Sequence, residues 1–298
     1  MANVGISHDT HNEQSYITVQ EYRNAPTAID IDNLVVVGNL DAQNAELANL
    51  IARASSYMDE YFNQNLCANS ETETQRVRVS NMGYLAVHPN NDPVIAVTEF
   101  NYGTDPNNLN SLSQLDQIWF EEQQFLVPVA PLSATQWSSQ GPLGFYGFPP
   151  SGRTWVYCSY TYDAGYVNNA LAVAVATEST ITMANPRGIR AGFDYIISDG
   201  PRTEKIVVDS SYEYGSIYVP LAYPLRYSHA EGVTLGNLPS AVKQACILIT
   251  TAFAKVRGDG SLTMGITTKP IGNQLPAQMY GGEIALAMTM VDKFRRIR

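Results

Sequence analysis

The most regular pattern of apolar and polar positions runs from Asp41 to Asn63. Apolar residues recur there at every third or fourth position, and polar residues occupy the opposite face. Neither glycine nor proline interrupts the stretch, and Asp41 is expected to cap the helix at its N-terminus. The pattern predicts a helix about 34 Å long. We expect the other elements to pack against it as a spine.

The period of the pattern changes to two after this helix, which predicts β-strands. The expected strands cover residues 75–80, 84–88, 94–102 and 153–162, with a hairpin formed by 117–120 and 124–129. Two long loops are expected between them. Residues 103–114 are rich in asparagine, and residues 131–152 contain four prolines and four glycines.

Residues 168–237 differ from the preceding region because short strands recur there at even spacing. The expected strands cover residues 171–177, 179–183, 193–198, 204–208 and 216–219. Turn sequences separate them, which is typical of a small all-β sandwich or barrel.

Helical patterns flank these β regions. The sequence TVQEY forms a capping box in which Thr18 and Glu21 exchange hydrogen bonds, so a short helix is expected to begin there. A second helix is expected from Leu238 to Gly258, and a last one at 281–298. Residues 259–280 are expected to be a flexible linker, and residues 1–16 a mobile arm.

Composition narrows the class of function. Charged residues make up 15% of the 298-residue chain, below the roughly 25% of typical soluble domains, and 18 tyrosines are present. Low charge with many tyrosines suits contact with other proteins, although tyrosine also favours strands. The net charge of −10 argues against a protein that grips phosphates. No secretion signal or membrane-spanning run is evident, so synthesis in a cytoplasm and no membrane partner are expected.

The sequence offers no convincing catalytic or cofactor site, so we expect a protein that is not an enzyme and holds no cofactor. His8, Asp9 and His11 have metal-like spacing but lie in the expected arm. Cys158 with His229 and an aspartate is a weak nucleophile candidate, because Cys158 lies inside an alternating strand. Four carboxylates could pair as acid and base, although turn roles explain the aspartates better: Asp163, Asp194, Asp199 and Glu204.

The order of the motifs resembles the head-to-tail connector (adaptor) family of long-tailed bacteriophages. The resemblance lies in the capped TVQEY helix, the long helix of form AxLxxLIxxASxYMxxY, the strand that ends in YxAGY, and the LPxxVKQA sequence that opens a helix. The matching segments are Ile17–Leu66, Arg153–Tyr166 and Leu238–Gly258, under a third of the chain.

The resemblance implies an α+β fold: a helical adaptor core with a long central helix and β-strands (17–167 and 238–258), an inserted small β domain (168–237), and a C-terminal docking helix. In the family the YxAGY strand leads almost directly to the LPxxVK helix. The seventy or so intervening residues are therefore expected to form an insertion whose ends lie close together.

The family relation further implies a virion protein at the neck of the capsid vertex, in a ring of about twelve copies. Its partners would be the portal protein, a tail-side stopper or tail terminator protein, and further copies of itself. Genomic DNA would pass through the channel without sequence-specific binding. We expect the last helix to dock on the portal through an apolar face and a basic tip. That set comprises Ile284, Met288, Val291, Phe294, Arg295, Arg296 and Arg298. The alternative is that this last helix packs against its own domain and not against a portal.

The sequence is also compatible with two further classes of function. The first is a virion or cell-surface protein whose 168–237 domain binds carbohydrate or a receptor through its aromatic residues. The second is an enzyme of unusual type, against which stands the lack of a convergent set of ionisable groups.

Overall fold

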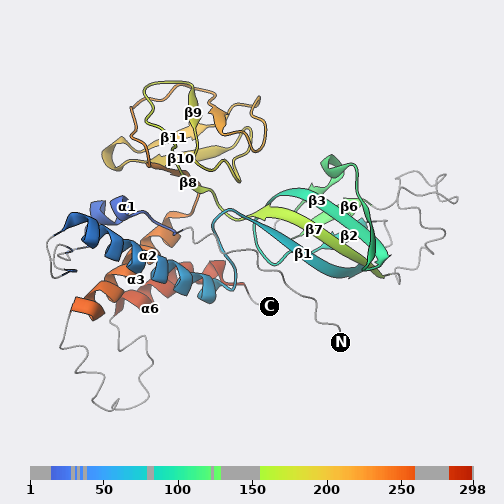
Figure 1. Ribbon diagram of the computed structural model, residues 1–298, viewed down its shortest axis with the longest axis horizontal. Helices are drawn as coiled ribbons and strands as arrows, with labels where there is room; N and C mark the ends of the chain where they lie inside the picture. The colour runs from blue at the N-terminus through green and yellow to red at the C-terminus, as the bar shows by residue number, and fades with distance from the viewer. Residues whose placement is uncertain are drawn as a thin grey trace, which may run out of the picture. The chain divides into compact units, whose positions relative to one another are not determined.

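The computed structural model describes residues 15–27, 31, 34–35, 39–78, 84–121, 124–128, 155–258 and 282–296. The fold contains both α-helices and antiparallel sheets and is therefore α+β (Figure 1). Two compact units are present. One is formed by Ala68–Gly165, here called the sheet unit, and the other by the flanking segments up to Cys67 and from Tyr166. The second unit contains a helical core and an inserted domain (168–237).

The helical core contains the long helix expected from the sequence. Its elements are α1 (Val19–Asn24), α2 (Leu40–Phe62), α3 (Ser240–Gly258), α6 (Gly282–Val291) and the short 3-10 turn η4 (Asp292–Phe294). The apolar side of α2 is buried, and α3 lies along it with α6 beside α3 (Figure 1). The 23-residue α2 thus serves as the spine that its periodicity predicts.

The helix caps agree with the sequence at α1 and differ at α2. The capping box of Thr18 and Glu21 is present in both directions. At α2 the cap is Asn39, whose side chain accepts a hydrogen bond from the N–H of Asp41 at 3.0 Å. Asp41 instead lies in the first turn, where a carboxylate is favoured by the helix dipole.

The structure also differs from the sequence-based expectations for the N-terminal arm, at Tyr16, and for the extent of the last helix. Tyr16 is fully buried against Phe62, so the expected mobile arm does not extend to it. The last helix ends at Val291 and continues only as a 3-10 turn. It ends there because Phe294 turns back toward the ring of Phe62 and the N–H of Arg296 bonds to the Phe62 carbonyl.

In the described part of the sheet unit, seven strands form two antiparallel sheets. The strands are β1 (Asn69–Arg78), β2 (Tyr84–Val87), β3 (Val94–Asp105), β4 (Asn108–Ser111), β5 (Trp119–Phe120), β6 (Phe125–Pro128) and β7 (Trp155–Ala164). Their orders are β1-β7-β3-β4 and β2-β6-β5. The hairpin of β5 and β6 is confirmed, whereas the asparagine-rich segment expected as a loop supplies the end of β3 and all of β4.

An apolar core lies within the sheet unit and is separate from the apolar core of the helices. Phe100, Phe125 and Tyr160 form its centre, with the rings of Phe125 and Tyr160 edge to face at 5.2 Å. The sequence grouped these strands with the helices in one core, but long antiparallel strands bury their aromatic residues among themselves.

The inserted domain surrounds a third apolar core with short strands. These are β8 (Asn168–Ala170), β9 (Thr180–Thr182), β10 (Asp194–Ser198), β11 (Glu204–Val207), β12 (Tyr218–Pro220) and β13 (Thr234–Gly236). They form the sheets β11-β10-β13-β8 and β12-β9. The strand expected at 171–177 is replaced by isolated bridges from Leu171 and Val175, and β13 had no signal because it is only three residues long.

The sheet unit and the inserted domain are each closed by contacts between the two ends of the segment. Cys67 and Tyr166 form a parallel bridge, so the chain returns beside the point where it left for the sheet unit. The N–H of Val167 donates to the Asn237 side chain at 2.8 Å, and β8 pairs with β13, which closes the inserted domain. The ends of the insertion therefore lie together, as the sequence led us to expect.

Candidate functional site

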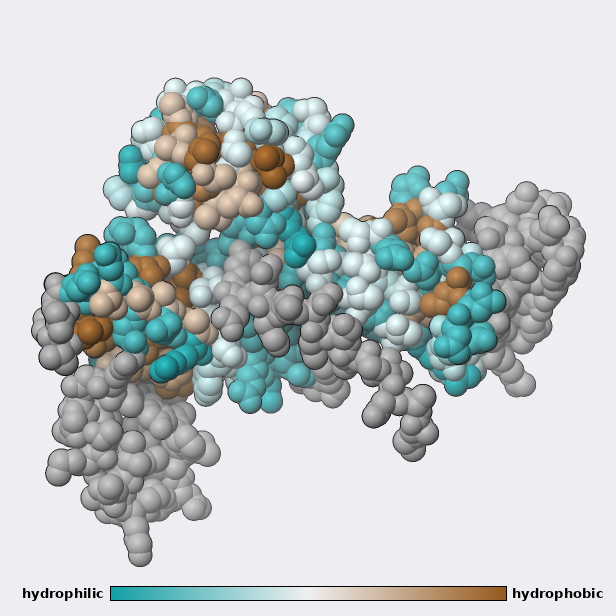
Figure 2. Space-filling model, viewed as in Figure 1, coloured by the Kyte–Doolittle hydropathy of each residue, from teal (hydrophilic) through white to brown (hydrophobic). Residues whose placement is uncertain are grey.

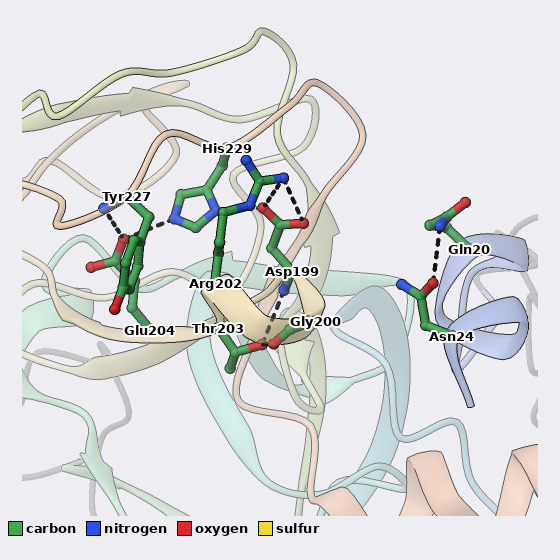
Figure 3. A network of polar contacts seen from close by, with 9 residues as sticks. All are labelled: Gln20, Asn24, Asp199, Gly200, Arg202, Thr203, Glu204, Tyr227 and His229. Atoms are coloured by element: carbon green, nitrogen blue, oxygen red, sulfur yellow. Dashed lines mark hydrogen bonds and ion pairs between the residues drawn. The ribbon is translucent and has the colours of Figure 1, made fainter. Parts of the chain in front are cut away.

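A cluster of ionisable side chains lies around His229 in the inserted domain (Figure 3). The His229 ring has no exposed surface. Its Nδ1 atom lies 3.0 Å from Asp199 Oδ2, and its Nε2 atom lies 2.8 Å from Glu204 Oε1. Both ring nitrogens of His229 therefore face carboxylate oxygens from two different residues.

The turn between β10 and β11 brings the two carboxylates to the same ring. The N–H of Asp199 donates to Thr203 Oγ1 at 3.1 Å, and the Thr203 hydroxyl donates to the Gly200 carbonyl at 2.8 Å. Gly200 has a φ of +54°, a left-handed conformation that glycine adopts without strain. Arg202 completes the turn with an ion pair to Asp199 at 3.2 Å.

Glu204 also holds the segment that precedes His229. Its carboxylate accepts the backbone N–H groups of Arg226 and Tyr227 at 3.0 and 3.1 Å. Burial alone would raise the pKa of Glu204, but these two backbone donors and His229 together hold that pKa below its ordinary value. The cluster therefore joins a turn of one sheet to a loop about 25 residues further along the chain.

The contacts give this cluster a structural role, because they tie the turn after β10 to the segment that ends at His229. Both nitrogens of His229 are engaged, so neither can take a proton from a substrate. The thiol of Cys158 belongs to β7 of the sheet unit, and burial raises its pKa to about 12, which disfavours the nucleophilic thiolate. The other candidate carboxylates are used elsewhere: Asp194 pairs with Lys205, and Asp163 is buried on β7.

A cleft of about 590 Å³ lies beside this cluster, within the same unit. It is lined by α1 and by the segments at 198–200 and 230–233. Its ionisable lining residues are all acidic: Glu21, Asp199 and Glu231. Glu21 and Asp199 are already engaged with Lys243 and Arg202, so these lining carboxylates are not a pair arranged for acid–base chemistry.

The residues expected to dock on the portal lie against the protein's own helices. Ile284 and Val291 are buried, and the Phe294 ring contacts those of Phe62 and Tyr166. The guanidinium group of Arg295 lies 5.3 Å from the centre of the Tyr61 ring, and Met288 packs at the edge of the same core. Arg298 is outside the described residues. Contact with a portal stays a prediction, and it would require α6 to leave this core.

Other sites considered from the sequence fall largely outside the described ranges. His8, Asp9 and His11 are not among them, nor are the loop at 129–154 and the linker at 259–281. Within the described ranges, no group of three histidine, cysteine or acidic residues is placed to hold a metal ion. In those ranges, too, no helix has the length and apolar character needed to cross a membrane.

One exposed arrangement of side chains has no counterpart in the sequence-based expectations. Arg76 and Arg78 of β1 lie directly opposite Tyr157 and Trp155 of β7. The alternating sequences RVR and WVY are its signal, but only the strand register shows that they face each other.

No family model matches the chain, and no curated protein matches it. Among solved structures, the chain is similar to one described as the neck of an empty GTA particle computed with C6 symmetry. The identity is 12%, the TM-score is 0.34, and the match covers 96% of this chain and 95% of that one. A TM-score this low does not establish a common fold.

Proposed function

We propose that this chain is a virion structural protein, a head-to-tail adaptor that forms a ring between the portal and the tail-side proteins and leaves a channel for DNA. One observation carries the proposal. Two segments that resemble the adaptor family, 17–66 and 238–258, lie far apart in the sequence but form one helical core. The Tyr22 hydroxyl bonds to Thr251 Oγ1 at 3.0 Å, and Ser55 Oγ lies 3.7 Å from Cys246 Sγ.

The charge of the chain supports the same proposal. A protein of net charge −10 that surrounds a channel would repel passing phosphates rather than hold them. We further propose that the protein is not an enzyme and needs no cofactor, since the ionisable cluster at His229 has no free nitrogen for catalysis.

The proposed contact with the portal is made by α6 after it leaves the helical core. Hydrogen exchange of the α3 amides should then increase when portal rings are added, because α3 would lose the cover of α6. Unchanged protection of α3 in a portal-bound protein would show that another surface makes the contact.

Light scattering of the purified chain, alone and mixed with portal rings, followed by particle imaging, tests the proposal. The expected result is a defined ring of about twelve copies, formed alone or on the portal. A chain that stays monomeric and does not bind the portal would contradict the adaptor function.

The inserted domain supports a second candidate, the recognition of carbohydrate or a receptor. Tyr218 and Tyr223 are 61% and 73% exposed, and Phe193 and Tyr227 are also exposed. Figure 2 shows hydrophobic side chains in brown among polar ones on this domain. Exposed aromatic rings of this kind can stack on sugars. A glycan array probed with the full chain distinguishes the candidates, because an adaptor predicts no binding.

A further inference from the structure

The pairing of β1 with β7 produces a ladder of alternating cations and aromatic rings on the sheet unit. We call Arg76, Arg78, Trp155 and Tyr157 the arginine–aromatic ladder. The guanidinium carbon of Arg76 lies 5.1 Å from the centre of the Trp155 ring and 5.7 Å from that of Tyr157. The guanidinium carbon of Arg78 lies 5.7 Å from the Trp155 ring. At these distances the guanidinium groups form cation–π interactions with the rings, and these interactions hold the four side chains together on one face of the sheet.

The ladder is open to solvent. Both arginines are exposed, and Trp155 is 45% exposed. Among the described residues, no carboxylate forms an ion pair with Arg76 or Arg78. The edges of the guanidinium groups therefore remain available to an acidic partner, while the aromatic rings offer apolar surface.

The surrounding charge makes this face unusual. The sequence from Ala68 to Gly165 contains three basic residues against nine acidic ones. Two of those three basic residues are Arg76 and Arg78, placed two positions apart on one strand. The ladder is thus a local positive site on an acidic unit of an acidic chain.

We propose that the arginine–aromatic ladder is one side of the contact between neighbouring copies of this chain, where it receives carboxylates of the next copy. The inference rests on the proposed ring. Rotational rings of more than two copies use heterologous contacts, in which one face of a subunit meets a different face of its neighbour. Copies of net charge −10 repel one another, so a stable contact needs a basic face opposite an acidic one.

The residue types favour a protein partner over nucleic acid. Tryptophan, tyrosine and arginine are the residues that most often dominate the energy of protein–protein contacts. Two arginines could neutralise only two phosphates, and the acidic residues of the same unit would oppose a nucleic acid lying across it. Copies of this chain supply carboxylates in excess.

The test reverses the charge of the ladder in the full chain. R76E/R78E should raise the protein concentration needed for ring assembly by on the order of 100-fold, about tenfold for each arginine. The matched control R190E/R226E changes the charge equally in the inserted domain and should leave assembly unchanged. Circular dichroism and thermal unfolding verify that both variants fold, and R76K/R78K, which keeps the charge, should retain part of the assembly.

The outcomes separate this inference from the proposed function. If the wild-type chain forms no ring with or without portal, both are wrong. If wild type and R76E/R78E assemble equally, only the ladder inference is wrong.

A photo-crosslinker identifies the partner directly. With p-benzoylphenylalanine in place of Tyr157, illumination of assembled rings should link one copy to an acidic segment of another. Crosslinking to the portal or to added DNA, without links between copies, would overturn the inference.

Discussion

Glu21 and Lys243 are 222 positions apart in the chain, yet their side chains form an ion pair of 2.7 Å. The same Glu21 oxygen accepts the Thr234 hydroxyl at 2.8 Å, and the other accepts the N–H of Thr18 at 2.9 Å. One carboxylate thus joins α1, α3 and the inserted domain. The pair is largely shielded from water, so breaking one side leaves a charge with little solvation.

Lys243→Met should lower the free energy of unfolding by about 1 to 3 kcal/mol, since Glu21 would lose its cation in a poorly hydrated place. Lys255→Met is the matched control, because the Lys255–Glu283 pair is more exposed and should contribute under about 1 kcal/mol. Urea denaturation measures both. Equal losses in the two variants would contradict the role given to Glu21.

The buried Glu73 should be more important to the sheet unit than its neighbours on the exposed face. It accepts the hydroxyls of Tyr160 and Tyr162 and the N–H of Asn90. Glu73→Ala leaves these donors without an acceptor and should cost about 3 kcal/mol or more. Thr72→Ala, which removes an exposed hydrogen bond to Thr161, should cost under about 1 kcal/mol. Denaturation monitored by tyrosine fluorescence compares them.

Much of the fold follows from local pattern, and much of the rest depends on contacts between distant segments. The period of α2 and the capping box at Thr18 are local, so the sequence predicts them. The sequence does not predict strand β4, because nearly all its side chains are polar and exposed, which removes the alternation. The partners of His229 lie 25 and 30 positions away in the sequence. Arg76 and Tyr157, which pair across two strands, lie near opposite ends of the sheet unit's sequence. The two members of each pair are too far apart in the sequence for a local pattern to predict their contact.

Acid should weaken the inserted domain through Glu204. The pKa of Glu204 is lower in the folded protein than its ordinary value of 4.5, so its stabilising effect is present above pH 4.5 and is lost as the pH falls through the folded value. Glu204→Gln should reduce the loss of unfolding free energy below pH 4.5 relative to wild type. Asp194→Asn, at an exposed pair with Lys205, should not. Identical pH profiles for wild type and Glu204→Gln would refute this assignment.

The three cysteines should be unreactive in the folded protein. Cys67, Cys158 and Cys246 are buried free thiols. Burial raises the pKa of Cys158 and Cys246 to about 12, and it raises that of Cys67 further still. A thiol reagent such as dithionitrobenzoate at pH 8 should therefore modify no thiol until denaturant is added, and then three. Rapid modification of any one in native conditions would show that its segment opens locally.

The bridge from Cys67 to Tyr166 and the bond from Val167 to Asn237 place the two closures next to each other along the chain. The sheet unit and the inserted domain each leave the helical core and return to it at one point. Residues 166–167 separate the end of the sheet unit from the start of the inserted domain. A recombination event could therefore exchange the coding sequence for either β segment while the helices keep their mutual contacts. Relatives of this protein would then differ chiefly in what they carry at these two junctions, and a heterologous domain with adjacent termini could be grafted at either one.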